Sequence, residues 1–212
     1  VFHAPILTLH LIFARGLLKH GNKVAGIREW LKNIFDIRHN IFSYLMVVIL
    51  SIIFILPQRL ISGYENGAPF YAIIVMIPVM LVGGGLEEAG WRYILQPELE
   101  KKYPFPISTL TVSVIWWLWH LPLFYIQGAG QYGHNYLAFG INVLGISFAL
   151  ASIRKNTGSV WLCVLFHCIV NSLLGIYVIN DNMWGNIVAA TILIFSSCAL
   201  VRIQGKIKVF HK

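Results

Sequence analysis

The chain has 212 residues, of which 58% are hydrophobic and only 11% charged, and its formal net charge at pH 7 is +8. Soluble domains usually carry about 25% charged residues, so this composition excludes an ordinary soluble domain and favours a protein embedded in lipid. The positive charge is spread over several short connections between apolar runs. A nucleic-acid-binding protein would gather it on one soluble face, so we expect no nucleic-acid partner.

Apolar runs close to membrane-spanning length recur along the whole chain. A transmembrane helix needs about 20 mostly apolar residues. Six runs approach this length, and a seventh at 5–18 is shorter; the six cover 41–61, 69–86, 107–127, 136–153, 159–180 and 184–201. The sequence therefore predicts an all-α fold, a polytopic bundle of about seven transmembrane helices that forms a single domain over residues 1–212. Because the chain starts at Val1 without an initiator Met, we expect a fragment that lacks an N-terminal helix.

The connections between these runs alternate in charge. Lys and Arg occur in 19–38, 101–102, 154–155 and 202–212, whereas 62–68, 128–135 and 181–183 contain neither. Cytoplasmic loops of membrane proteins are enriched in Lys and Arg. We therefore predict a multi-pass cell-membrane protein with its C-terminus and the basic connections in the cytoplasm.

The first basic connection, 19–40, has a helical pattern of its own. Ile27, Trp30, Leu31, Ile34 and Phe35 recur at helical spacing between basic residues. This pattern suits a basic amphipathic helix on the cytoplasmic membrane face. A solvated cytoplasmic linker is an equally open interpretation.

Two adjacent glutamates, Glu87 and Glu88, follow an apolar run and three glycines. Ionisable residues at membrane depth are costly and usually functional. In a helix Glu88 and Arg92 would share a face as an i, i+4 pair, while Glu87 would point about 100 degrees away. Glu87 would then act as a general base on water. The alternative is a salt bridge at a helix end near the membrane interface.

Three further polar side chains lie inside apolar runs. His120 lies among tryptophans, where its structural role would be a hydrogen bond near the headgroups. His167 and Asn171 are four residues apart and share a helical face, which suits either helix-to-helix hydrogen bonding or a base beside an amide that stabilises an oxyanion. A glutamate with two histidines is a ligand set that zinc accepts in hydrolases. If a metal is present we expect Glu87, His120 and His167 to bind it, although a metal-free glutamate mechanism is favoured.

Together these residues resemble the CPBP family, the CAAX-protease and bacteriocin-processing (Abi) membrane proteins. The family's three signatures, Glu-Glu-x-x-x-Arg, Phe-x-x-x-His and His-x-x-x-Asn, match Glu87 to Arg92, Trp116 to His120 and His167 to Asn171. Trp116 stands where the family usually has Phe. The resemblance covers roughly 83–175.

The resemblance implies an intramembrane endopeptidase, labelled a metalloendopeptidase in parts of the family, with a cavity open to the cytoplasm. It implies that Glu87 activates water together with His120, and that Glu88 and Arg92 position that glutamate and the substrate backbone. His167 and Asn171 would stabilise the oxyanion. The substrate would be a peptide or protein, with or without a lipid, cleaved in CAAX-type or bacteriocin-leader processing. The alternatives are a non-proteolytic immunity or scaffold member of the family and a proton-coupled transporter.

The predicted topology puts Glu87 and His120 at different depths. His120 would lie ~20 Å from the cytoplasmic end of its helix at 1.5 Å per residue, whereas Glu87 would lie near the end of its own. We expect the glutamate-bearing helix to begin deeper in the membrane, with the glycines marking the break.

Overall fold

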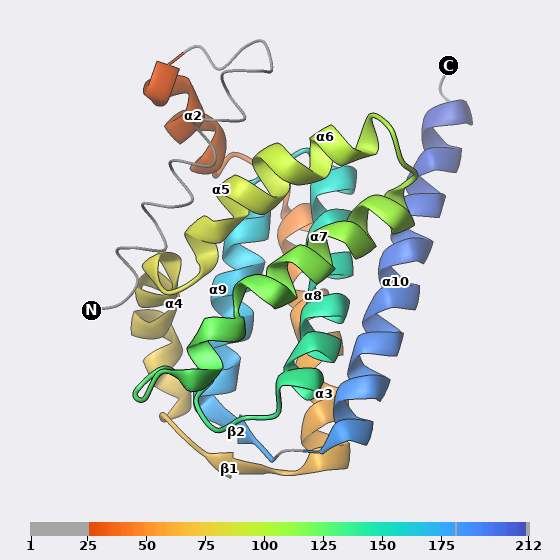
Figure 1. Ribbon diagram of the computed structural model, residues 1–212. Coiled ribbons are helices and arrows are strands. Elements are labelled where there is room, and N and C mark those ends of the chain that lie inside the picture. Colours follow the sequence, from red (N-terminus) through yellow and green to blue (C-terminus); the bar gives the residue numbers. More distant parts are fainter. Residues whose placement is uncertain (1–25, 181, 211–212) are drawn as a thin grey trace.

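Helices make up most of the residues that the computed structural model describes, which are 26–180 and 182–210 (Figure 1). The predicted all-α bundle is confirmed. The α-helices are α2 (Gly26–Ile34), α3 (Ile41–Ser62), α4 (Ile73–Val82), α5 (Glu88–Gly90), α6 (Gln96–Glu100), α7 (Phe105–Trp119), α8 (Tyr136–Thr157), α9 (Trp161–Ile176) and α10 (Met183–Phe210).

Polar residues and glycines at the ends of the apolar runs set the helix limits. Asn40 precedes α3 and accepts a hydrogen bond from the backbone N–H of Ser43 at 2.9 Å. Asn135 caps α8 in the same way by accepting from two backbone N–H groups. Such caps satisfy donors that have no partner in the first turn. At the other end of α8, Gly158 takes φ 71°, a left-handed conformation that glycine adopts at low cost.

Five helical segments are long and apolar enough to cross a membrane, judged by length and composition among the described residues. They are Ile41–Ser62, Phe70–Glu100 with its break, Phe105–Tyr125, Tyr136–Thr157 and Met183–Gly205. The remaining span of the six, 159–180, contains α9, which has only 16 residues. The seventh, 5–18, lies outside the described residues.

The predicted span 159–180 is wrong at its C-terminal end. Helix α9 stops at Ile176, and Tyr177–Ile179 form strand β2 instead. This strand pairs antiparallel with β1 (Tyr64–Asn66), with Glu65 opposite Val178. Tyr, Val and Ile favour strands, and β1 lies beside them only because α3 and α9 end at the same level.

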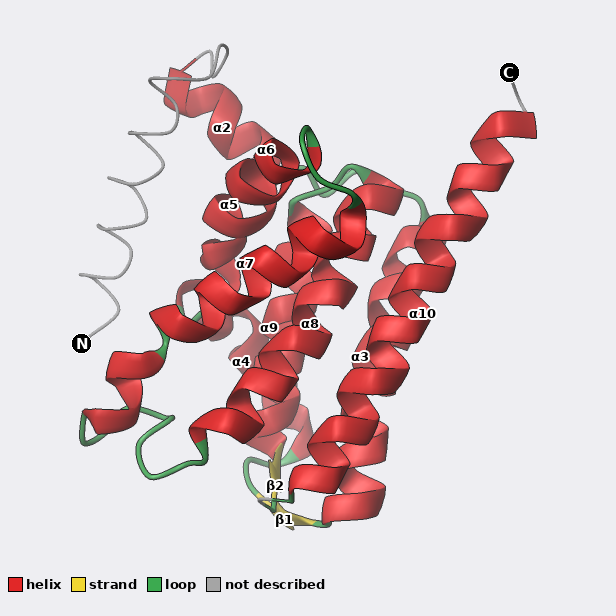
Figure 2. Ribbon diagram, turned by 45° about the vertical axis from the view of Figure 1, so that its right-hand side comes forward, coloured by secondary structure: helices red, strands yellow, loops and turns green. Residues whose placement is uncertain are grey.

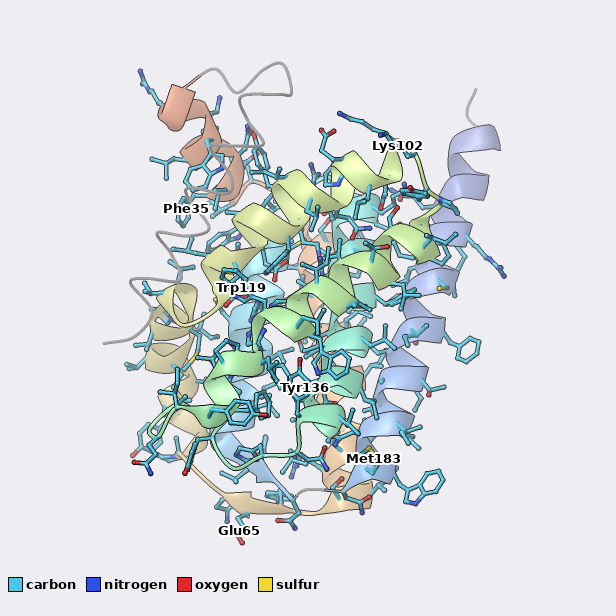
Figure 3. All side chains as sticks on the ribbon, in the orientation of Figure 1. Phe35, Glu65, Lys102, Trp119, Tyr136 and Met183 are labelled. Atoms are coloured by element: carbon cyan, nitrogen blue, oxygen red, sulfur yellow. The ribbon has the colours of Figure 1, made fainter. Side chains whose placement is uncertain are left out.

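The helices pack so that the basic connections and the connections without Lys or Arg lie at opposite ends of the molecule. Figure 1 shows α2, the α6–α7 connection and the end of α10 at one end, and β1 and β2 at the other. Figure 3 places Lys102 and Glu65 at these two ends. Figure 2 shows α3 and α10 side by side and α7 crossing in front of α8 and α9. The alternation of charge in the sequence therefore corresponds to two ends of one bundle.

The buried core lies between α3, α7, α8, α9 and α10. Its main cluster includes Phe54, Val112, Leu150, Phe166 and Leu193, each fully buried. The outward faces of α3, α4 and α7 expose many large apolar side chains, such as Phe42, Ile74 and Leu118. Apolar outer faces are expected where the surroundings are lipid rather than water.

Helix α2 confirms part of the helical pattern predicted for 19–40. Its last residue, Ile34, is fully buried in a second cluster with Ala89 and Val160. Trp30 packs against the same cluster, while Arg28 and Lys32 are exposed. The amphipathic helix therefore packs on the protein at the basic end of the bundle.

Candidate active site

The glutamates lie just after a break in the second predicted span, 69–86. A 3-10 turn (Phe70–Ala72) and α4 carry this span only as far as Val82, and two glycines interrupt it. The chain then continues through a 3-10 turn (Gly85–Glu87), α5, a turn of π-helix (Trp91–Leu95) and α6. The expected break at the glycines is thus confirmed, and the helix that carries the glutamates begins at mid-depth of the bundle (Figure 1).

Glycine is required here because the backbone at the break lies against side chains of α9. A methyl group on Gly84 would lie 2.8 Å from both His167 Nε2 and Asn171 Nδ2, and one on Gly85 would lie 2.5 Å from the Sγ of Cys168. Cβ atoms in protein structures do not approach other atoms this closely. The two glycines therefore let the backbone beside the glutamates approach the polar face of α9.

Glu88 is fully buried and is held from two sides. His167 Nδ1 lies 2.8 Å from its Oε1, and Arg92 Nε lies 3.6 Å from its Oε2. An ionised carboxylate only accepts hydrogen bonds, so Nδ1 of His167 carries the proton and donates it. The Glu88–Arg92 pair predicted from the sequence is present, and His167 is an additional partner.

Arg92 is also fully buried, and its second partner comes from α8. Its Nη2 donates to the Oγ of Ser147 at 2.9 Å and to the Ser147 carbonyl at 3.3 Å. Sequence reasoning missed Ser147, because one serine in an apolar helix gives no signal of an arginine 55 residues away. The buried charge of Arg92 is thereby fixed between the glutamate and this serine.

Glu87 faces α7 rather than α9. Its Oε2 accepts a hydrogen bond from the indole N–H of Trp116 at 2.8 Å and a longer one, 3.4 Å, from Trp91. Glu87 and Glu88 therefore point to different partners, as their 100-degree separation on a helix predicts.

His120 follows the last residue of α7 and meets the site through Trp116. Its Nδ1 donates to the Trp116 carbonyl at 2.8 Å, and its ring packs against Trp116 and Phe139 with centroid distances of 5.9 and 5.1 Å. Since Nδ1 carries the proton, Nε2 is the acceptor nitrogen of neutral His120. His120 is 8% exposed.

The structure thus brings all three sequence signatures to one place. Glu87 and Glu88 come from the broken helix, His120 from the end of α7, and His167 and Asn171 from α9. The conflict of depth is resolved because Glu87 lies immediately after the break, where the C-terminal half of α7 reaches it. Figure 3 shows the neighbouring Trp119 of α7 close to this junction.

The described residues contain no group of three or more His, Cys, Asp or Glu side chains arranged to hold a metal ion. The candidate ligands Glu87, His120 and His167 do not form such a group. His167 directs Nδ1 to Glu88, and the Oε2 of Glu87 accepts from indole N–H groups. We therefore derive no chemical step through a metal.

A separate polar region lies toward the strand end of the bundle. A cavity of about 310 Å³ is lined there by amide side chains, including Gln58, Asn142 and Asn186, and by Phe139, which also packs on His120. Among the described residues its lining contains no Lys, Arg, Asp or Glu, and its one histidine is His134. It is a neutral cavity beside the charged site.

The helical bundle thus contains a buried carboxylate–histidine pair with a second carboxylate beside it. This arrangement is typical of membrane proteins that have a polar site inside the bundle. The family model for the type II CAAX prenyl endopeptidases, described as Rce1-like, matches residues 69–173. Over 137 residues the chain is 27% identical to CAAX prenyl protease 2 of Methanococcus maripaludis, covering 59% of this chain and 50% of that protein. Both matches support the CPBP family of CAAX-protease-like membrane proteins, which the three sequence signatures resemble. The chain spans about half the length of this relative.

Proposed function

We propose that the protein is an intramembrane endopeptidase that hydrolyses a peptide bond with water activated by Glu87. The observation that carries this proposal is that two glutamates meet His167 and Asn171 beside Gly84 and meet His120 through Trp116, from three separate helical segments. Buried ionisable groups are costly in a membrane. A catalytic site accounts for all of them together.

In the first step Glu87 accepts a proton from water while the water oxygen attacks the carbonyl carbon of the substrate. General bases of this kind must lie within hydrogen-bond reach of the proton they take. His120 presents Nε2, its acceptor nitrogen, and orients the same water. The π-electrons of the carbonyl move onto its oxygen, which becomes an oxyanion.

Asn171 and His167 stabilise that oxyanion. The Nδ2 of Asn171 and the Nε2 of His167 both lie against Gly84, so their donors converge on one position. Protonated on both nitrogens, His167 donates from Nε2 while Glu88 balances its charge through Nδ1. Preorganised donors at a developing negative charge are usually the largest catalytic contribution.

Collapse of the tetrahedral intermediate breaks the C–N bond and completes the reaction. Glu87, now a carboxylic acid, returns its proton to the departing nitrogen, so the immediate products are a carboxylic acid and an amine. Transfer of the acid's proton to the amine then gives a carboxylate and an ammonium ion. Arg92 acts on Glu88 and not on the substrate. It fixes the carboxylate that orients His167, and Ser147 in turn holds Arg92.

The substrate class that we propose is a membrane-associated peptide with a prenylated C-terminal Cys-a-a-X sequence. The name of the Methanococcus maripaludis relative supports it. The basic connections lie at one end of the bundle, which supports a cytoplasmic position for that end and for the C-terminus. The substrate would reach the site from that side.

The direct test is cleavage by the purified protein in liposomes, followed by mass spectrometry. A farnesylated Cys-a-a-X peptide is compared with the same peptide lacking the farnesyl group and with an unmodified leader-type peptide. We expect cleavage of the farnesylated peptide and none with Glu87→Ala or His120→Ala. Unchanged cleavage by Glu87→Ala would refute the glutamate mechanism.

Two further outcomes separate the other interpretations. Cleavage that survives exhaustive chelation supports the metal-free mechanism, whereas loss that zinc restores would require a metal. If the wild-type protein cleaves none of the three peptides while folded, the protease proposal fails and a non-proteolytic role in the family replaces it.

A further inference from the structure

Trp116 contacts both sides of the site described above. Its indole N–H donates to Glu87 Oε2 at 2.8 Å, and its carbonyl accepts from His120 Nδ1 at 2.8 Å. The residue is 3% exposed, so these contacts are made inside the bundle. Its side chain and its backbone thus hold the two groups proposed to share the water.

The ring of Trp116 also contacts the other half of the site, which contains His167 and Arg92. It packs edge-on against His167 with a centroid distance of 5.4 Å, and the guanidinium carbon of Arg92 lies 5.8 Å from its centroid. The aromatic ring therefore contacts both His120 and His167.

We propose that Trp116 is a positioning residue of the endopeptidase, whose indole N–H orients the Glu87 carboxylate and whose ring sets the separation of His120 and His167. This inference rests on the proposed function. It concerns a position where the sequence signature usually has Phe, which can supply the ring but not the donor.

The physical argument concerns the N–H group. Tryptophan is a donor only, so it stabilises the charged carboxylate and cannot compete with it for the proton of the water. Hydrogen bonds to charged groups are about twice as strong as neutral ones. A carboxylate held in this way keeps one orientation, and positioning errors of about 1 Å can lower a rate 100-fold.

The test compares Trp116→Phe with Trp117→Phe in the farnesyl-peptide assay. Trp117 is the matched control, because its indole N–H donates to the carbonyl of Tyr136 at 3.0 Å and its ring stacks on that tyrosine, outside the site. We expect Trp116→Phe to lower kcat about tenfold or more, with KM and melting temperature little changed. Trp117→Phe should leave kcat unchanged.

Two more variants separate the donor from the ring. Benzothienylalanine inserted at position 116 keeps the shape of the indole and replaces only its N–H. It should therefore lower kcat as much as Trp116→Phe, and it tests the donor even if Trp116→Phe folds poorly. Trp116→Leu removes the ring as well and should lower kcat further. Wild-type kcat for the folded benzothienylalanine variant would overturn this inference while leaving the proposed protease intact, whereas an inactive wild-type protein would remove both.

Discussion

Two polar regions lie inside this apolar bundle, and they differ in how their groups are satisfied. The charged centre contains Glu88, Arg92 and His167, each at most 6% exposed and each bonded to a residue distant in sequence or on the next turn. The amide cavity contains Asn142, whose Nδ2 donates to Asn186 Oδ1 at 3.1 Å, and Gln58, which donates to the carbonyl of Phe54 in its own helix.

The two regions differ in what their polar side chains contact. For Gln58, Asn142 and Asn186, one helix-to-helix hydrogen bond and one local bond are present, which is usual helix association in membranes. In the charged centre the groups converge on a backbone turn where two glycines leave no room for a side chain. If the two regions differ in this way, substitutions in the charged centre should affect cleavage far more than substitutions in the amide cavity.

The largest effect should come from Glu87→Gln. The amide oxygen can still accept from Trp116, but it is too weak a base to take a proton from water, so we expect activity to fall at least about 1000-fold. The melting temperature should stay close to that of the wild type. Peptide cleavage and thermal unfolding in the same detergent measure both quantities, and substantial residual activity would contradict the role of Glu87.

Glu88→Gln should reduce both stability and activity. It leaves the buried guanidinium of Arg92 without a counter-charge, and breaking a buried pair in this way costs about 3–5 kcal/mol. The double variant Glu88→Gln/Arg92→Met should recover part of the melting temperature but none of the activity. Equal stability of the single and double variants would show that the pair is not coupled.

Gly84→Ala should lower activity about 100-fold, because its methyl group would displace His167 and Asn171 from the turn. Gly83→Ala is the matched control. A methyl group there would lie 3.3 Å from the Sδ of the flexible Met80 side chain and 3.5 Å, an ordinary contact distance, from backbone atoms of Met80 and Val79. Similar kcat values for the two variants would show that close approach at Gly84 is not needed.

The smallest effect should come from the amide region. Asn186→Leu leaves the Nδ2 of Asn142 without its acceptor and should cost about 1–2 kcal/mol of stability. The double variant Asn142→Leu/Asn186→Leu should cost less, because both polar partners are removed. Cleavage activity should be unchanged in both, and a large loss of kcat would place the amide cavity within the catalytic machinery.

The sequence was most informative where one local pattern was enough. Apolar run length predicted the long helices, and alternating Lys and Arg predicted which connections share an end. Three glycines before Glu87 predicted the break, because glycine tolerates close approach and bends. The i, i+4 spacing of Glu88 and Arg92 predicted their pairing.

Local patterns failed where contacts join distant residues. Nothing around Ile176 predicts that α9 stops there, since the pairing of β2 depends on β1 more than 100 residues earlier. The partnership of Arg92 with Ser147 likewise depends on how α8 packs. Trp116 was visible as a departure from a family signature, but its hydrogen bond to Glu87 required the angle at which α7 crosses the bundle.

The sequence by itself therefore determined a helical membrane protein, its break, and the residue types of its site. Spacing along one helix sets which side chains share a face, so pairs such as Glu88 and Arg92 can be predicted from the sequence. Only the tertiary structure decided that Glu88 holds His167, that Trp116 holds Glu87, and that the amides face a separate neutral cavity. Those partners come from different helices, whose relative depth and crossing are fixed by packing.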